Sequence, residues 1–245
     1  MRTPEEVMRS VTTDMIRRAI KRGRKKGRTI SISKTAKGKA IHVASLNPDT
    51  ADGRRNLAAF LTPPARHYTF SGLGAPEEPN AVNWRTINLP FARKVFVLLL
   101  VGLTFLMKGT PFKIKVYRLM GVNIGSNVEI MQLAWLDHFR PELIFVGDNT
   151  LIGAYSRLTV HAYEGQGRFR YGIIEIGKNC VIGAGTGIGP MLIEDGVRTL
   201  PGTTLSPYLV RVRAGSVVGY NPPPVKLAAT EAAVASPSSL ETPAS

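Results

Sequence analysis

Two residues in the middle of the chain, Asp137 and His161, have side chains that could act together in acid–base chemistry. A neutral imidazole, with an ordinary pKa of about 6.5, can take a proton from a hydroxyl group near pH 7. A carboxylate can accept hydrogen bonds from substrate hydroxyls and orient an attacking oxygen. The adjacent His138 lies in an insertion, described below, and is the weaker candidate. Taken alone, these residues could also be a loop histidine and a solvated turn aspartate without a role.

The composition indicates a globular protein without disulfide bonds. Of the 245 residues, 44% are hydrophobic and 20% are charged, which is close to the globular average. Cys180 is the single cysteine, so the chain has no intrachain disulfide, and we expect no metal site built on cysteines. The first ten residues contain no apolar run of the signal-peptide kind. We therefore expect a cytoplasmic protein, peripheral on the inner face of a membrane if it binds one.

Positive charge is concentrated near the N-terminus. The net charge is +15, and eight basic residues fall between positions 17 and 28. They continue a helix predicted from about Thr3 to Lys26, with a capping box formed by Thr3 and Glu6 and a partial apolar stripe. Residues 1–28 are therefore predicted to be a basic amphipathic helix that binds an anionic membrane surface. Nucleic acid is the less favoured partner, because residues 1–41 contain no aromatic side chain for base stacking.

The remaining sequence outside residues 121–226 divides into three regions. Residues 29–90 show no sustained periodicity and are predicted to be an irregular or disordered linker, with a short helix near 54–61. Residues 91–120 form a helical lead-in, with an apolar helix at 91–108 that either covers the open end of the next region or lies in a membrane interface. Its thirteen-residue apolar run would reach about 20 Å as a helix, which is too short for a bilayer core of about 30 Å. Residues 227–245 are predicted to be a disordered tail.

Residues 121–226 carry a repeat with a period of six. Aliphatic residues recur in three groups of three, and within each group the residues are six positions apart. At six of these nine positions the next residue is glycine. The triplets are Ile124, Ile130 and Leu136; Val146, Ile152 and Leu158; and Ile176, Ile182 and Ile188. Such hexapeptides describe the faces of a triangular parallel β-helix, in which aliphatic residues stack inward and small residues allow the corners. The predicted body is therefore all-β.

The repeat is interrupted at three places. About four residues are inserted between Leu136 and Val146, around the sequence HFRP. The segment 161–175 keeps the count but loses the pattern, which indicates a loop that leaves the β-helix. Between Ile188 and Leu205 the spacing is seventeen, one short of a coil, and Arg211 falls on a nominally inward position. The last coil is thus predicted to be irregular or shifted.

At this point a family resemblance can be stated. The stretch WLDHFRPELIFVGDNTLIGAYSRLTVHAY resembles the hexapeptide-repeat acetyltransferases, of the maltose/galactoside and capsule or lipopolysaccharide sugar O-acetyltransferase type. The match covers about residues 111–226. It implies a left-handed β-helix, a homotrimer, and acetyl-CoA bound between neighbouring subunits. It also implies acetyl transfer to a saccharide hydroxyl in polysaccharide modification, with a histidine as general base.

The resemblance assigns roles to individual positions. His161 matches the catalytic histidine, and Asp137 matches a position that helps to bind the acceptor. Ala184 and Ala214 match small residues that line the acetyl-CoA site. The CoA phosphates must be bound by cationic side chains. The nearby candidates are Arg213 and Lys226, together with Arg211.

Two other interpretations were weighed against this one. A carbonic anhydrase of the same fold needs three histidines around zinc, and this body has only His138 and His161. A non-catalytic β-helix scaffold is the stronger alternative. It is favoured by the irregular last coils and opposed by the presence of Asp137 and His161. About ten residues of the family pattern are also missing after Val218, which bears on the binding of CoA. The acceptor sugar, an amine acceptor and a longer acyl group stay open.

Overall fold

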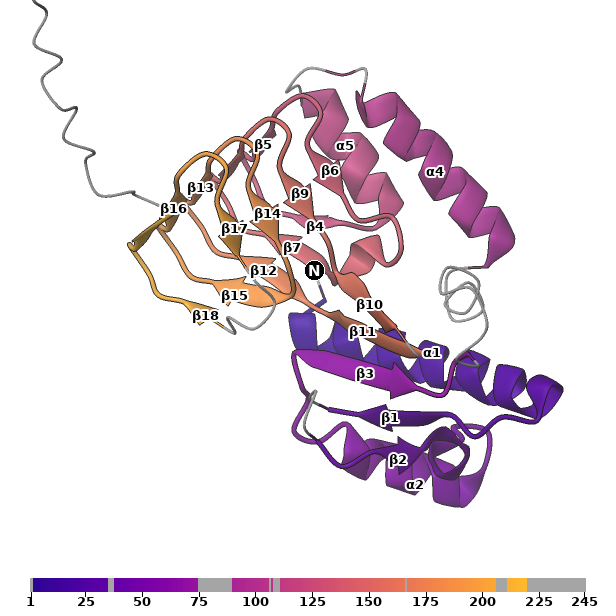
Figure 1. Ribbon diagram of the computed structural model, residues 1–245. Coiled ribbons are helices and arrows are strands. Elements are labelled where there is room, and N and C mark those ends of the chain that lie inside the picture. Colours follow the sequence, from indigo (N-terminus) through magenta and orange to yellow (C-terminus); the bar gives the residue numbers. More distant parts are fainter. Residues whose placement is uncertain are drawn as a thin grey trace, which may run out of the picture.

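The computed structural model describes residues 2–34, 38–74, 90–105, 107, 111–165, 167–205 and 211–219. Within them a β-helix lies beside a smaller antiparallel sheet and its helices (Figure 1). Lys226 and the predicted tail at 227–245 lie outside the described residues.

Three parallel sheets form the β-helix, as the six-residue period predicts. The first sheet contains β4 (Asn123–Ile124), β7 (Ile144–Val146), β12 (Ile174–Ile176), β15 (Met191–Ile193) and β18 (Arg211–Val212). The second contains β5 (Glu129–Ile130), β8 (Leu151–Ile152), β13 (Val181–Ile182), β16 (Arg198–Thr199) and β19 (Val217–Val218). The third contains β6 (Trp135–Leu136), β9 (Arg157–Leu158), β14 (Gly187–Ile188) and β17 (Thr204–Leu205). A left-handed winding of these coils stays a prediction.

Stacked aliphatic side chains form the core of the β-helix. Ile130, Ile152 and Ile182 are fully buried and pair in register across β5, β8 and β13. The corners need small residues because successive coils approach closely there. A Cβ added to Gly153 would lie 2.6 Å from the amide nitrogen of Ala184 on the next coil. Larger residues at this corner would push the coils apart.

The irregular last coils come from two changes of spacing between inward residues. Ile188 and Ile193 are five residues apart, one fewer than the repeat, and Leu205 and Val212 are seven apart, one more. Arg211 is therefore not inward: it is exposed and forms an ion pair with Glu194. The shift places an apolar residue inside and the charge outside.

Two helices cover the open end at the first coil, and the second of them makes most of the contact with the strands. Helix α5 (Pro111–Met120) packs on β4 and β5, and α4 (Phe91–Phe105) packs on α5. The Tyr117 hydroxyl donates to the Ala134 carbonyl at 3.0 Å, and the Lys113 ammonium donates to the Met131 carbonyl at 2.6 Å. The cap expected from residues 91–108 is thus supplied by α5. None of the helices that the structure describes is long and apolar enough to cross a bilayer.

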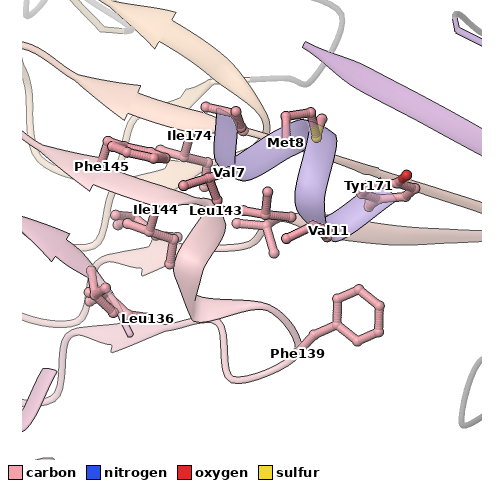
Figure 2. Packing of buried hydrophobic residues seen from close by; sticks show 14 of the residues in the cluster. Val7, Met8, Val11, Leu136, Phe139, Leu143, Ile144, Phe145, Tyr171 and Ile174 are labelled. Atoms are coloured by element: carbon pink, nitrogen blue, oxygen red, sulfur yellow. The ribbon is translucent and has the colours of Figure 1, made fainter. Parts of the chain in front are cut away.

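The N-terminal helix is a core element. Helix α1 (Pro4–Lys26) begins with the predicted capping box of Thr3 and Glu6. Its apolar stripe, including Val7, Met15 and Ile16, is buried within the chain. Figure 2 shows the first turns of α1 over Leu143, in the short helix η3 (Pro141–Leu143) of the insertion. The apolar face that we expected to meet a membrane is therefore buried against other parts of the same chain, among them η3 and the segment Val43–Leu46.

Residues 29–74 are not an irregular linker. They contain β1 (Ser31–Ser33), β2 (Ile41–His42), η1 (Val43–Leu46), α2 (Ala51–Phe60) and β3 (His67–Ser71). Strand β3 pairs with the hairpin β10 (His161–Gly165) and β11 (Arg168–Gly172), giving the sheet order β10-β11-β3-β1-β2. Strands this short show no sustained period, and their pairing partners lie far away in the sequence, which explains why the pattern was missed.

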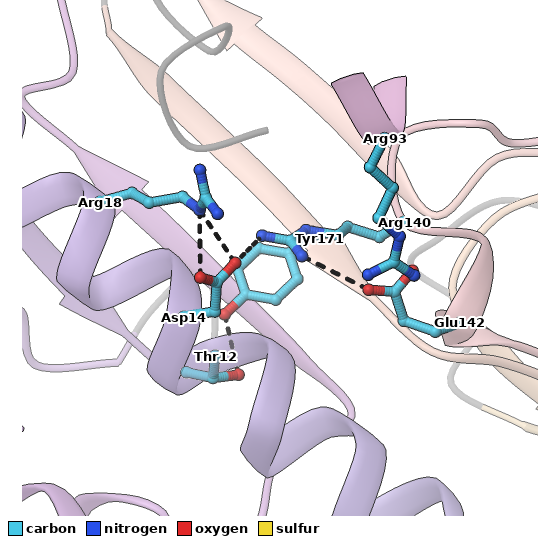
Figure 3. Close-up of polar contacts among 7 residues, drawn as sticks. All are labelled: Thr12, Asp14, Arg18, Arg93, Arg140, Glu142 and Tyr171. Atoms are coloured by element: carbon cyan, nitrogen blue, oxygen red, sulfur yellow. Dashed lines mark hydrogen bonds and ion pairs between the residues drawn. The ribbon is translucent and has the colours of Figure 1, made fainter. Parts of the chain in front are cut away.

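Polar contacts join α1 to the β-helix and the hairpin (Figure 3). Arg140 lies 2.5 Å from Asp14 and 3.4 Å from Glu142, and the Tyr171 hydroxyl donates to the Thr12 hydroxyl at 2.9 Å. Burial raises the pKa of Asp14, but hydrogen bonds and charges from Arg18 and Arg140 outweigh burial and lower the pKa overall. The N-terminal segment is thus tied to the region around the candidate site.

Candidate active site

Asp137 and His161 meet at one corner of the β-helix. Asp137 directly follows β6, and its amide donates to the Leu158 carbonyl at 2.9 Å, which aligns it with the next coil. His161 is the first residue of β10, where the chain leaves that next coil. The His161 Nδ1 atom lies 2.6 Å from Asp137 Oδ2. Residues that are far apart in sequence therefore form an aspartate–histidine pair because the coils stack.

The surroundings of Asp137 determine what it can do. Its side chain is fully buried, and its Oδ1 atom accepts from the Phe139 amide at 2.8 Å. Its Oδ2 atom accepts from the Val160 amide at 2.9 Å as well as contacting His161. This differs from the expected contact with the acceptor, because a carboxylate buried in this way meets the imidazole instead. Its geometry suits orientation of His161.

The Asp137 contact sets the tautomer of His161. An ionised carboxylate can only accept hydrogen bonds, so the atom that faces it must be a donor. His161 Nδ1 therefore carries the hydrogen in its contact with Asp137. In the neutral ring this leaves the lone pair on Nε2. The partner that fixes the histidine, which the sequence pattern does not reveal, is therefore Asp137.

Aromatic rings hold the imidazole in place. The ring centroids of His161 and Phe139 are 4.7 Å apart, and Phe169 stacks on His161 at 5.6 Å. Phe139 and Phe169 are fully buried, whereas the His161 side chain keeps 20% of its exposure. The sequence analysis did not select these phenylalanines, although both lie in segments where the repeat pattern is lost. They restrict the ring while leaving part of it accessible.

His138 lies beside this pair but makes different contacts. Its ring meets the edge of Trp135 at 5.6 Å, and its Nδ1 atom is buried without a hydrogen-bond partner in the structure. Burial lowers the pKa of His138, Asp137 raises it, and the charges of His161 and Lys94 lower it further. The lowered pKa keeps His138 neutral at pH 7. It is thus close to the pair without joining it.

The N-terminal sheet supports the hairpin that carries His161. In β11, Phe169 pairs with Phe70 and Tyr171 pairs with Tyr68 of β3. In β10, His161 itself pairs with Tyr171. Residues from the segment predicted to be a linker therefore fix the strand that presents the histidine. The signal available in the sequence was the aromatic content of 67–71 and 163–171.

The two alanines expected to line the cofactor lie at different corners of the described chain. Ala184 is exposed at the corner after β13, whereas Ala214 is exposed at the corner after β18, between different sheets. The Ala214 amide already donates to a Glu194 carboxylate oxygen at 2.9 Å. Arg213 is exposed beside it, and Lys226 lies outside the described residues. The expected pantetheine contact at Ala214 is thus occupied by a side chain.

No group of three or more histidine, cysteine, aspartate or glutamate side chains that could hold a metal ion occurs in the part of the chain that the structure describes. Cys180 is buried in the β-helix, and burial raises the pKa of its thiol.

No family model matches the sequence, and no curated protein matches it. The fold is similar to three solved acetyltransferases. A maltose O-acetyltransferase from Clostridium difficile 630 is 17% identical, over 51% of this chain and 80% of that chain, with a TM-score of 0.41. A hexapeptide-repeat containing acetyltransferase from Vibrio cholerae is 13% identical, over 54% and 87%, with a TM-score of 0.43. A galactoside acetyltransferase in complex with coenzyme A is 15% identical, over 51% and 75%, with a TM-score of 0.39. All three structures are named acetyltransferases, as is the family that the sequence resembles. What they share with this chain is the fold.

Proposed function

We propose that the protein transfers an acetyl group from acetyl-CoA to a hydroxyl group of a saccharide. The observation that carries this proposal is the short contact between His161 Nδ1 and Asp137 Oδ2, 2.6 Å, with the carboxylate fully buried. With Nδ1–H held by the carboxylate, Nε2 of this partly exposed ring is the nitrogen that can accept a proton. The resemblance of the sequence around these residues to sugar O-acetyltransferases supplies the substrate classes.

The proposed reaction is a direct displacement in which His161 moves one proton. Nε2 takes the proton from the acceptor hydroxyl as its oxygen bonds to the thioester carbonyl carbon. The carbon–sulfur bond then breaks, and the imidazolium returns the proton to the leaving thiolate. The products are the acetyl ester and the free thiol of CoA, so atoms and charges balance.

Asp137 serves this reaction as a positioning residue. Its carboxylate holds Nδ1–H, which fixes the direction of Nε2, and it stabilises the imidazolium that forms during transfer. Phe139 and Phe169 limit rotation of the ring and shield its faces from water. Both effects favour a preorganised base.

The proposal includes acetyl-CoA as co-substrate and a homotrimer with the cofactor between neighbouring subunits, as the resemblance implies. Ala184 stays a candidate contact because it is exposed at its corner. Arg211 and Arg213 stay candidates for the phosphates, with the Glu194 carboxylate competing for both. Light scattering after size exclusion tests the trimer.

Calorimetry with acetyl-CoA tests the cofactor assignment without a choice of acceptor. We expect micromolar binding at about one site per chain. A folded protein that binds no acetyl-CoA at millimolar concentration would overturn the acetyltransferase proposal in favour of a scaffold. If binding is found, a panel of saccharide acceptors with detection of released thiol identifies the substrate.

A further inference from the structure

Helix α4 exposes an extended apolar surface. Most of its large hydrophobic side chains are solvent-exposed, with Phe91 at 82% and Leu99 at 69%. The exposed set on α4 is Phe91, Val95, Phe96, Leu98, Leu99, Leu103 and Phe105. At 3.6 residues per turn these positions cover about half of the helix circumference. A surface of this size on a soluble chain indicates an interaction site.

The buried side of α4 is narrow. Val97, Val101 and Thr104 face the body, and α4 packs mainly on α5. On α5, Phe112 and Leu119 are exposed too, at 57% and 63%. Figure 1 shows α4 as the outermost element at the first-coil end of the molecule. The apolar surface of α4 is thus presented outward, away from the stacked coils.

Every charged residue on these two helices is basic. Arg93 and Lys94 are on α4, and Lys113, Lys115 and Arg118 are on α5. Arg93 points toward Glu142 of the body at 3.7 Å, and Lys94 lies close enough to His138 to lower its pKa. Lys115 and Arg118 are exposed beside Phe112 and Leu119. An apolar surface with basic flanks complements the charge of an anionic lipid bilayer.

From these observations we propose that α4 lies in the interfacial plane of an anionic membrane, with its apolar surface in the acyl region and the exposed Lys115 and Arg118 of α5 near the phosphates. The 15 residues of α4 reach about 22 Å, which is shorter than a bilayer core of about 30 Å, so the helix lies along the surface. Helix α1, by contrast, has its apolar face in the protein core. This inference does not depend on the proposed acetyl transfer.

A second copy of the chain fits the surface less well. Pairing of α4 and α5 with the same helices of another molecule would bring basic flanks together, and these helices contain no acidic residue to neutralise them. Like charges brought together at an interface oppose association. An anionic lipid surface removes that repulsion.

Vesicle sedimentation with the full chain tests the proposal. Vesicles of phosphatidylcholine alone are compared with vesicles of equal parts phosphatidylcholine and phosphatidylglycerol, at low and at high salt. We expect binding to the anionic vesicles, weaker binding to the neutral ones, and loss at high salt, where charges are screened. Absence of binding to anionic vesicles would overturn the proposal.

Two matched variants locate the surface. Leu99→Glu should weaken binding to anionic vesicles about tenfold or more, because a charge replaces a leucine side chain that the lipid would otherwise cover. Val217→Glu makes a comparable change at a residue of similar exposure, 67%, on β19 in the last coil, and should bind like the parent. Both sites are exposed, so unchanged circular dichroism and melting temperature are expected to confirm the fold. Equal binding by the two variants would contradict the role of α4.

The oligomeric state distinguishes a membrane from a second copy of the chain as the partner of the α4 surface. If α4 served to pair copies of the chain, Leu99→Glu would change the mass measured by light scattering and leave vesicle binding intact. That outcome would overturn the membrane proposal. We expect the opposite: an unchanged mass and weakened vesicle binding.

Discussion

Asp137 directs His161 from inside the protein: its Oδ2 atom lies 2.6 Å from His161 Nδ1, and the carboxylate is fully buried. Two backbone amides, of Phe139 and Val160, bind the same carboxylate. The pair therefore depends on the stacking of neighbouring coils. It gives the histidine a defined tautomer at the edge of the β-helix.

The first prediction concerns Asp137→Asn. The asparagine side chain has one oxygen that accepts hydrogen bonds in place of two, so it cannot accept from both backbone amides and from His161 Nδ1 as the carboxylate does. The imidazole then loses its fixed tautomer. We expect kcat to fall on the order of 100-fold while KM for acetyl-CoA stays unchanged. Steady-state kinetics measures both constants. Asp14→Asn, which weakens a contact outside the Asp137–His161 pair, is the control and should keep the kcat of the parent. An increase in KM with unchanged kcat in Asp137→Asn would refute the positioning role.

The second prediction concerns Arg140, which is 4% exposed between Asp14 and Glu142. Arg140→Ala leaves the buried Glu142 carboxylate without its nearest cation, so we expect a loss of about 3–5 kcal/mol in the free energy of unfolding. Arg18→Ala removes a more exposed i,i+4 pair and should cost only about 0.3–0.5 kcal/mol. Urea denaturation measures both losses, and equal losses would show that burial of the network does not matter.

The third prediction tests whether α1 is part of the core. Met15 is fully buried, so Met15→Ala should lower the free energy of unfolding by about 2–5 kcal/mol. Lys25→Ala, at an exposed position on the same helix, should change it by less than about 0.5 kcal/mol. Denaturant titration gives the comparison. A stable Met15→Ala protein would mean that α1 is not docked as described.

The fourth prediction concerns acid stability. Burial and the charges of Arg170 and Arg66 lower the pKa of His67, and burial also lowers the pKa of His138. In the unfolded chain the pKa of both groups returns to the ordinary value of 6.5, so both bind protons more readily than in the folded protein. The free energy of unfolding should therefore decrease as the pH falls below about 6.5.

A histidine substitution measures this effect. His67→Gln should flatten the dependence of the melting temperature on pH between about 7 and 5. His42→Gln, at an exposed position, is the matched control and should keep the slope of the parent. An unchanged slope in His67→Gln would contradict the assigned role of this histidine.

The sequence predicted the β-helix well because each coil repeats the same local requirement. Ile152 must stack on Ile182, and Gly153 must admit the next coil, so the pattern is visible without tertiary information. The capping box at Thr3 and Glu6 is similarly local. The short strands at 31–33 and 67–71 are different, because their partners are each other and a distant hairpin.

The candidate site residues were selected one by one, as positions in a motif. His161 was selected by its motif. Its contact with Asp137 depends on how neighbouring coils align, and the sequence spacing alone did not show that the two side chains meet. The apolar stripe of α1 was correctly placed on one face of a helix. Its partner was predicted to be a membrane, because amphipathicity does not distinguish lipid from a protein core.

Thiol release from acetyl-CoA by purified His161→Ala, in the presence of an accepted saccharide, tests the central claim most directly. A general base contributes at least about 100-fold, so we expect the variant to keep its fold and lose transfer by that factor or more. His42→Ala is the matched control and should turn over like the parent. Near-normal transfer by a folded His161→Ala protein would contradict the assignment of His161 as the base.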